Sequence, residues 1–381
     1  MTDRDNTNDE TVEPALPSKP KRKFYHKRFW TIVMMVIVLG LAVNLLLPQL
    51  RALENSWEVV KDLTWWALGL AIITQFLSYL SAGYMIHAIM AANDQKMSIW
   101  KGAMIYAASY SVGLVAGGWV AGAAATVGWV KSESRDGRVA LLAGALPPLY
   151  LNASLTGLAL LGIIYLLAIH DLSQGQLIQY LIYLGILSFI TYGELLALRF
   201  PHKASSILIK LGGWWAKLFH KPFDAQIVSA RIENFAEAWH GMRGHRWIKP
   251  FLGALGYLAG DMLTLFLLFV AAGRVLSPGF LLAGYSLPLL LSKVIFLFPG
   301  GIGLIEVTMI ALFSNLTKAR QISLVGTLAY RLISFWSTTI IGFVFAGILS
   351  RQTIKRSKED NQLQSEEATP PEIDAPLTPQ G

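Results

Sequence analysis

The sequence predicts an all-α polytopic membrane protein, and three observations lead to this fold class. Apolar residues make up 54% of the chain and charged residues only 15%, which is typical of a protein that lies largely in lipid. Several apolar runs are about 20 residues long, enough for a helix to cross a bilayer. Another apolar run, from Phe280 to Phe313, contains Pro, Gly and a carboxylate, none of which a lipid-facing helix needs.

These apolar runs define one transmembrane domain at residues 29–350, flanked by polar tails. The tails at 1–28 and 351–381 are rich in polar residues and Pro, and we expect both to be disordered. Within the domain we assign six crossings: Phe29–Leu47, Thr64–Ala91, Val139–Ile169, Leu177–Phe200, Phe251–Ala272 and Ile322–Ser350.

Two apolar regions interrupted by glycines, at about 102–130 and 280–313, are predicted to be re-entrant helical hairpins. Backbone groups freed by Pro and Gly cannot face hydrocarbon, so they must lie against protein or line a wet cavity. In the second region, Phe280–Phe298 can cross about 30 Å at about 1.5 Å per residue, but Leu304–Phe313 reaches only about half of that. The simplest structure is a helix that enters, turns at the glycines and leaves on the same side.

The distribution of basic residues supports this assignment and places both termini in the cytoplasm. With six crossings, most of the 32 Lys and Arg residues fall in the N-tail, in the C-tail and in the loops on the same side, as cytoplasmic segments require. If 102–130 crossed the membrane instead, the basic loop 199–249 would lie outside. The two hairpins then open from opposite sides, which is typical of inverted repeats. Gly117-Gly118 and Gly300-Gly301 occupy similar positions before the next span, so the sequence is compatible with such a repeat.

The cytoplasmic loop 199–249 has an amphipathic pattern. Val228, Ile232, Phe235 and Trp239 share one helical face. Two interpretations remain open: helices lying at the inner headgroup surface, and a helix packed on the cytoplasmic face of the bundle.

Four ionisable residues lie inside the predicted membrane segments: Asp261, Lys293, Glu306 and Arg331. Such residues are rare in membrane spans and are candidates for function. Two interpretations are open. The charges neutralise one another, with Glu306 pairing with Arg331 or Lys293 and Asp261 with the remaining base, or they contact a substrate or a proton. Glu306 also follows Gly303 closely enough to cap the next helix.

No catalytic or metal-binding pattern accompanies these charges. The chain has no cysteine, its seven histidines are scattered, and it lacks nucleotide-binding, His-Glu-x-x-His and nucleophile-elbow motifs. We therefore expect no enzyme activity, no cofactor and no metal, and nothing indicates binding to nucleic acid.

The stretch Pro299-Gly300-Gly301-Ile302-Gly303-Leu304-Ile305-Glu306, with Tyr330-Arg331-Leu332-Ile333-Ser334-Phe335-Trp336 further on, resembles the transmembrane domain of lysylphosphatidylglycerol synthases. Stand-alone members of that family are predicted flippases, and the resemblance covers about 29–350. It implies translocation of phospholipid and carries a site role over to Pro299, Gly300, Gly301, Gly303, Glu306 and Arg331. The family's earlier motif is reduced here to Ala116-Gly117-Gly118, so a role for Gly117 and Gly118 is less well supported. No folded aminoacyl-transfer domain is expected after Ser350.

We therefore expect a flippase-like translocator of anionic or aminoacylated phospholipid in the bacterial inner (plasma) membrane, with Lys293 and Asp261 as additional candidate site residues. Two alternatives are a proton-coupled secondary transporter of a small polar solute and a non-transporting partner of an envelope-lipid enzyme. A homo-oligomer and a complex with a lipid-synthesis enzyme are both compatible with the sequence.

Overall fold

The computed structural model describes residues 57–116, 118–134, 136–169, 174–200, 244–294 and 301–367, together with single residues between 201 and 243. This part of the chain is helical and contains no strand. Its helices are α2 (Trp57–Lys61), α3 (Trp65–Ala92), α4 (Ile99–Ala116), α5 (Trp119–Ser134), α6 (Gly137–Ala168), α7 (Gln174–Arg199), α10 (Ile248–Ala271), α11 (Pro278–Val294), α12 (Leu304–Thr317), α13 (Arg320–Arg331), a π-helical turn (Leu332–Ser337) and α14 (Thr338–Glu367).

Within the described ranges, four helical segments are long and apolar enough to cross a membrane. They are Trp65–Ala92, Gly137–Ala168, Ile248–Ala271 and the continuous stretch Arg320–Ser357, which confirms the membrane helices predicted at these places. α7 occupies the predicted span Leu177–Phe200, and its apolar part is Leu177–Gly193. The first predicted span, Phe29–Leu47, and the N-terminal tail lie outside the described residues.

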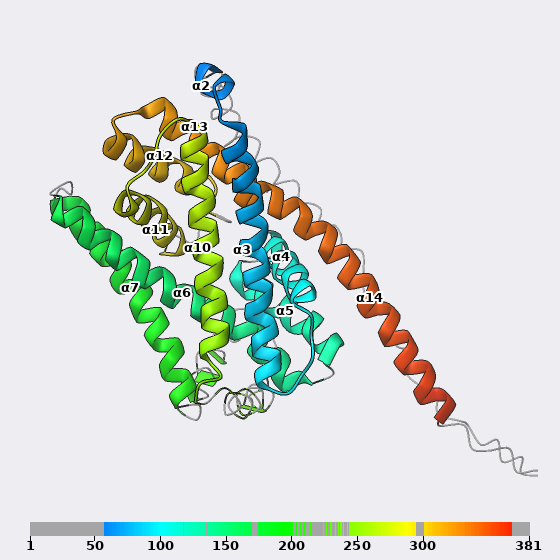
Figure 1. The fold of residues 1–381 in the computed structure, drawn as a ribbon. Helices are drawn as coiled ribbons and strands as arrows, with labels where there is room; N and C mark the ends of the chain where they lie inside the picture. Colours follow the sequence, from blue (N-terminus) through cyan, green and yellow to red (C-terminus); the bar gives the residue numbers. More distant parts are fainter. Residues whose placement is uncertain are drawn as a thin grey trace, which may run out of the picture.

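α3 and α10 form an antiparallel pair that packs closely along its length (Figure 1). A Cβ atom added at Gly253 would lie 2.8 Å from the Met85 backbone, so the two helix backbones approach each other very closely there. Further along, the hydroxyls of Thr74 and Thr264 are 3.0 Å apart. Small residues allow this approach, which is a common way for helices to pack in membranes.

α4 and α5 form the first hairpin, as the sequence predicts for 102–130. Gly113 of α4 faces Gly122 of α5, and Thr126 donates a hydrogen bond to the hydroxyl of Ser109 (2.7 Å). These pairs show that the helices run antiparallel. Gly118 lies at the tip with φ +77°, a conformation that favours glycine.

α11 and α12 form the second hairpin, as predicted for 280–313. Gly284 of α11 faces the ring of Phe313 in α12, and Gly301 faces Ser292, so these two helices are also antiparallel. The connection at 295–300, which includes Pro299 and Gly300, lies outside the described residues. Gly301 has φ +65° and, like Gly118 in the first hairpin, adopts a backbone conformation that other residues rarely take.

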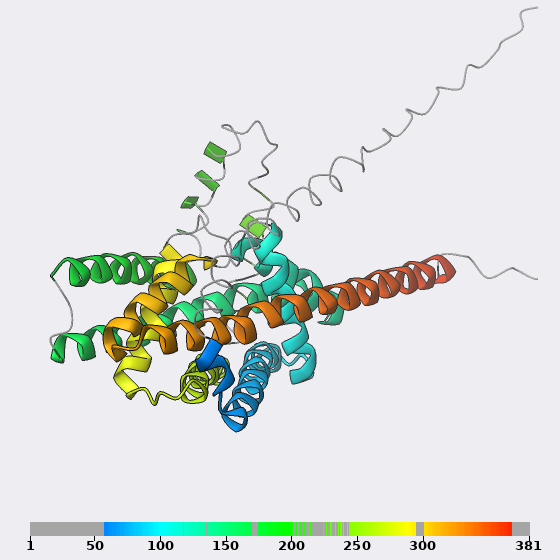
Figure 2. The same cartoon turned by 90° about the horizontal axis from the view of Figure 1, so that it is seen from above.

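The two halves of the chain repeat the same order of elements: a long helix, a hairpin and a long helix. Each hairpin packs against a long helix of the other half: α4 packs on α14, and α11 packs on α6. Figure 1 shows the hairpins toward opposite ends of the long helices, and Figure 2 shows the same helices from above. This arrangement is the one expected for the inverted repeat with which the sequence is compatible.

The C-terminal region differs from the sequence prediction, because α14 remains helical to Glu367 instead of becoming disordered at 351. Contacts with the first hairpin explain part of the difference. Arg356 and Lys101 each lie 2.9 Å from a carboxylate oxygen of Glu133, and Arg356 also donates to the Ser132 carbonyl (3.0 Å). Polar composition alone predicts disorder, but it does not reveal these tertiary ion pairs.

The described part of loop 199–249 favours one of its two interpretations. Phe235 and Trp239 pack against the core cluster that includes Met85 and Val130, and Met242 is buried within it. These residues therefore pack on the bundle.

Candidate functional site

Glu306 and Arg331 form an ion pair inside the helical bundle. Arg331 Nε donates to Glu306 Oε1 at 2.6 Å, and the two residues are 4% and 2% exposed. The other carboxylate oxygen, Oε2, accepts from the backbone N–H of Gly303 (2.7 Å). Both expectations for Glu306 therefore hold at once: it pairs with Arg331 and it caps α12. Gly303 has φ +81°, a conformation to which glycine is suited.

Both hairpins approach Arg331. Its guanidinium lies 4.1 Å from the ring centroid of Phe335, a distance at which a cation is attracted to an aromatic face. The Phe335 ring contacts Tyr110 of the first hairpin, with centroids 6.1 Å apart, while Glu306 belongs to the second hairpin. The chain forms a π-helical turn at Leu332–Ser337 immediately after Arg331, and π-helical turns occur frequently at functional sites.

Asp261 of α10 lies beside this ion pair in the bundle, but its partners are hydroxyl groups. Its Oδ2 atom accepts from Tyr330 (2.7 Å) and from Tyr285 (2.9 Å), and the residue is 5% exposed. The expectation that Asp261 pairs with the remaining base is wrong, since Lys293 is exposed in the last turn of α11. Tyr330 joins the two groups, because it precedes Arg331 in the chain and contacts Asp261.

The structure brings together Gly301, Gly303, Glu306, Arg331 and Asp261, while Gly118 belongs to the other hairpin and Lys293 is exposed in the last turn of α11. Gly118 lies at the tip of the other hairpin, where an added Cβ would meet no atom within 4 Å. Pro299, Gly300 and Gly117 lie outside the described residues.

Several residues of this site were not identified from the sequence. They are polar but carry no charge at neutral pH: Gln75, Tyr79, Tyr110, Tyr285 and Tyr330. Ionisable groups inside predicted spans identify charged candidates, but amides and phenols carry no such signal. Gln75, which lies inside the predicted span Thr64–Ala91, was the clearest available signal, because an amide in a membrane helix needs a partner.

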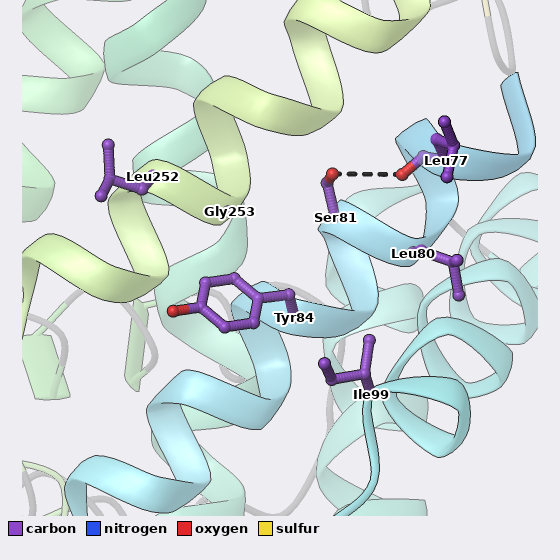
Figure 3. Close-up of a pocket in the computed structure, with 7 residues that line it drawn as sticks. All are labelled: Leu77, Leu80, Ser81, Tyr84, Ile99, Leu252 and Gly253. Atoms are coloured by element: carbon purple, nitrogen blue, oxygen red, sulfur yellow. Dashed lines mark hydrogen bonds between the residues drawn. The ribbon is translucent and has the colours of Figure 1, made fainter. Parts of the chain in front are cut away.

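A shallow groove of about 360 Å³ on the surface does not coincide with this site. Figure 3 shows that it lies between α3, the start of α4 and α10, with Leu77, Leu80, Ser81, Tyr84, Ile99, Leu252 and Gly253 around it. Ser81 already donates to the Leu77 carbonyl (3.1 Å). The groove contains none of the charged candidates. Within the described residues, no group of three or more His, Asp or Glu side chains could hold a metal.

The fold and the site define a polytopic helical membrane protein with a buried ion pair where two helical hairpins meet. The comparison with known families makes this specific: residues 30–342 match the family described as the lysylphosphatidylglycerol synthase TM region, and the chain belongs to that family. The resemblance inferred from the glycine-glutamate stretch and Arg331 is thereby confirmed.

A UPF0104 membrane protein of Methanocaldococcus jannaschii is similar to part of the chain. The two are 30% identical over 138 residues, which make up 35% of this chain and 40% of that protein. The matched region thus spans less than half of that relative.

Proposed function

We propose that this protein moves anionic or aminoacylated phospholipid between the two leaflets of the bacterial inner membrane. The observation that carries the proposal is the buried Glu306–Arg331 pair, located where both hairpins meet. Membership of a family named for the membrane region of a lipid-modifying enzyme supports it. We propose no enzymatic reaction for this chain and expect it to carry lipid made elsewhere.

In the proposed mechanism, the phosphate of a lipid headgroup takes the place of Glu306 on Arg331. A guanidinium is a planar fork that binds carboxylate and phosphate with similar geometry. The displaced Glu306 keeps its bond from the Gly303 N–H at the N-terminus of α12, where the helix dipole favours an anion. Because this second partner remains, releasing Arg331 costs less than it would for an isolated buried carboxylate.

The hairpins supply the route in this proposal. The first enters from the cytoplasm and the second from the outside, within six crossings and with both termini cytoplasmic. Alternate opening of the two hairpins exposes Arg331 first to one leaflet and then to the other, as in transporters built from inverted repeats. The acyl chains remain in lipid while the headgroup crosses between the hairpins.

Leaflet exchange in reconstituted vesicles tests this function. The purified full-length protein is placed in vesicles with fluorescent phosphatidylglycerol or its lysyl form, and an external quencher reports movement of the label. We expect faster exchange than in empty vesicles, and loss of the gain in Arg331→Ala and Glu306→Gln. Val307→Ala is the matched control, since Val307 is adjacent to Glu306 but 64% exposed, and it should retain activity.

The opposite results would redirect the interpretation. Exchange no faster than in empty vesicles for either lipid would refute translocation of these lipids. If both site variants kept cellular activity while changes in loop 199–249 abolished it, the protein would act as a non-transporting partner of a lipid-synthesis enzyme.

A further inference from the structure

The buried charges of the site do not balance. Among the described residues, the buried side chains of the core that can carry a full charge at neutral pH are Glu306, Arg331 and Asp261. The first two cancel, so an ionised Asp261 would leave one negative charge inside the bundle. A charge buried without a charged partner is very costly, and a carboxyl group in that position is more stable when protonated.

The hydrogen bonds of Asp261 locate where a proton would bind. Oδ2 accepts from Tyr285 and Tyr330, whereas Oδ1 has no hydrogen-bond partner. Buried polar atoms almost always have partners, so an exception requires an explanation. Both tyrosines point their only O–H donors at Oδ2, which makes Oδ1 the oxygen available for a proton.

Gln75 of α3 supplies the complementary group. It is 4% exposed, and neither its amide oxygen nor its amide nitrogen has a hydrogen-bond partner. The contacts on either side place it opposite Asp261 across the pair of α3 and α10: Thr74 lies 3.0 Å from Thr264, and Ser78 donates to the Tyr257 carbonyl at 2.7 Å. Gln75 is a neighbour of the Asp261 carboxyl, at a geometry outside that of a hydrogen bond. Two adjacent buried groups thus lack partners, and one proton between them gives Asp261 Oδ1 and the Gln75 amide oxygen a shared hydrogen bond.

We propose that Asp261 and Gln75 form a proton-binding site in the core of the bundle. In the protonated form, the Oδ1–H of Asp261 donates to Gln75 Oε1 while Oδ2 keeps both tyrosine bonds. When the proton leaves, rotation of the amide lets Gln75 Nε2 donate to Oδ1 instead. A glutamine suits both states, because its amide carries an acceptor and two donors.

Among the groups around the proposed site, Asp261 is the one expected to gain and lose a proton. Two tyrosines contact it, Tyr285 from α11 and Tyr330 from α13. Four more lie within electrostatic range: Tyr79 from α3, Tyr106 and Tyr110 from α4, and Tyr257 from α10. Phenols remain neutral at physiological pH. Arg331 and Glu306 are the charged neighbours, and they bind each other. The proton-binding carboxyl group is therefore that of Asp261 and not that of Glu306, a choice that the sequence alone left open.

Infrared difference spectroscopy of the full-length protein in lipid nanodiscs tests this site, because a protonated carboxylic acid has a carbonyl stretch that a carboxylate lacks. At neutral pH we expect this band in the wild type, its loss in Asp261→Asn, and its retention in Glu306→Gln. The Asn variant should fold, since its amide reproduces the protonated acid by donating to Gln75 and accepting from the tyrosines. Gln75→Leu should shift the frequency of the band, because it removes the hydrogen-bond acceptor.

Three results would overturn the proposal: no acid band at neutral pH, a band lost in Glu306→Gln and kept in Asp261→Asn, or a band that appears only when sodium ions are removed. The third result would assign the site to a metal cation. The measurement requires no lipid movement, so its outcome is independent of the leaflet-exchange assay. The site can hold a proton even if the protein moves no lipid, and lipid can move even if the site is empty.

Discussion

Glu306 and Arg331 lie 25 residues apart in the chain and are joined by a 2.6 Å contact inside the bundle. The contact connects the second hairpin to the helix that follows it. Since both residues are buried, removing either one leaves the other without its charged partner in a medium that solvates charge poorly. This relationship leads to the first prediction.

Arg331→Met should destabilise the protein by about 3–5 kcal/mol, the usual cost of removing one partner of a buried ion pair. Combining it with Glu306→Gln should recover part of the loss, since the buried carboxylate is then gone as well. Thermal unfolding of the single and double variants in detergent measures this coupling. Strictly additive effects would show that the two side chains do not interact in the membrane protein.

Gly253→Ala should separate α3 from α10. The added Cβ would lie 2.8 Å from the Met85 backbone, and the expected cost is about 1–3 kcal/mol, as for other overpacked interfaces. Gly69→Ala on α3 is the control, because its Cβ would meet nothing within 4 Å and alanine favours a helix. Equal unfolding temperatures for both variants would contradict the close packing of these helices.

The ion pairs at Glu133 should make the attachment of α14 depend on pH. Burial raises the pKa of Glu133, but hydrogen bonds and charges from Lys101 and Arg356 outweigh this effect and hold the pKa below its ordinary value. A group whose pKa is lowered on folding stabilises the protein above the pKa of its unfolded form, about 4.3, and loses that contribution as the pH falls through the folded pKa.

The unfolding temperature of the wild type should therefore exceed that of Glu133→Gln above about pH 4.3, and the difference should shrink at lower pH. Glu237→Gln serves as the matched control. Glu237 also pairs with an arginine, Arg138, but its side chain is 61% exposed, and exposed pairs contribute little. A difference between wild type and Glu133→Gln that is constant with pH would argue against this cluster.

Cysteine labelling should place the two hairpin bases on opposite sides of the membrane. The chain has no cysteine, so any labelling comes from the single cysteine that is introduced. We expect Lys96→Cys, exposed in the loop before the first hairpin, to react only from the cytoplasm. Lys318→Cys, exposed in the turn after the second hairpin, should react from outside. Labelling of both from the same side would exclude hairpins that enter from opposite sides.

The sequence by itself determined the membrane class, the positions of four long apolar helices among the described residues, and the family. The physical reason is that hydropathy and helix breaking are local properties: about 20 apolar residues must form a spanning helix, and Gly301 and Gly303 must interrupt one. The glycines that interrupt the apolar regions 102–130 and 280–313 indicated the hairpins in the same way.

Only the tertiary structure decided which side chains meet. The sequence could not choose between Arg331 and Lys293 as the partner of Glu306. It also left open whether Asp261 pairs with a base, whereas the structure shows tyrosines bound to it. The sequence also predicted a disordered tail from residue 351, whereas α14 continues to Glu367 and its Arg356 pairs with Glu133. Such pairings depend on which helix faces lie together, and that choice comes from the packing of small residues such as Gly253 between distant helices. Composition and hydropathy along a single chain carry no record of these contacts.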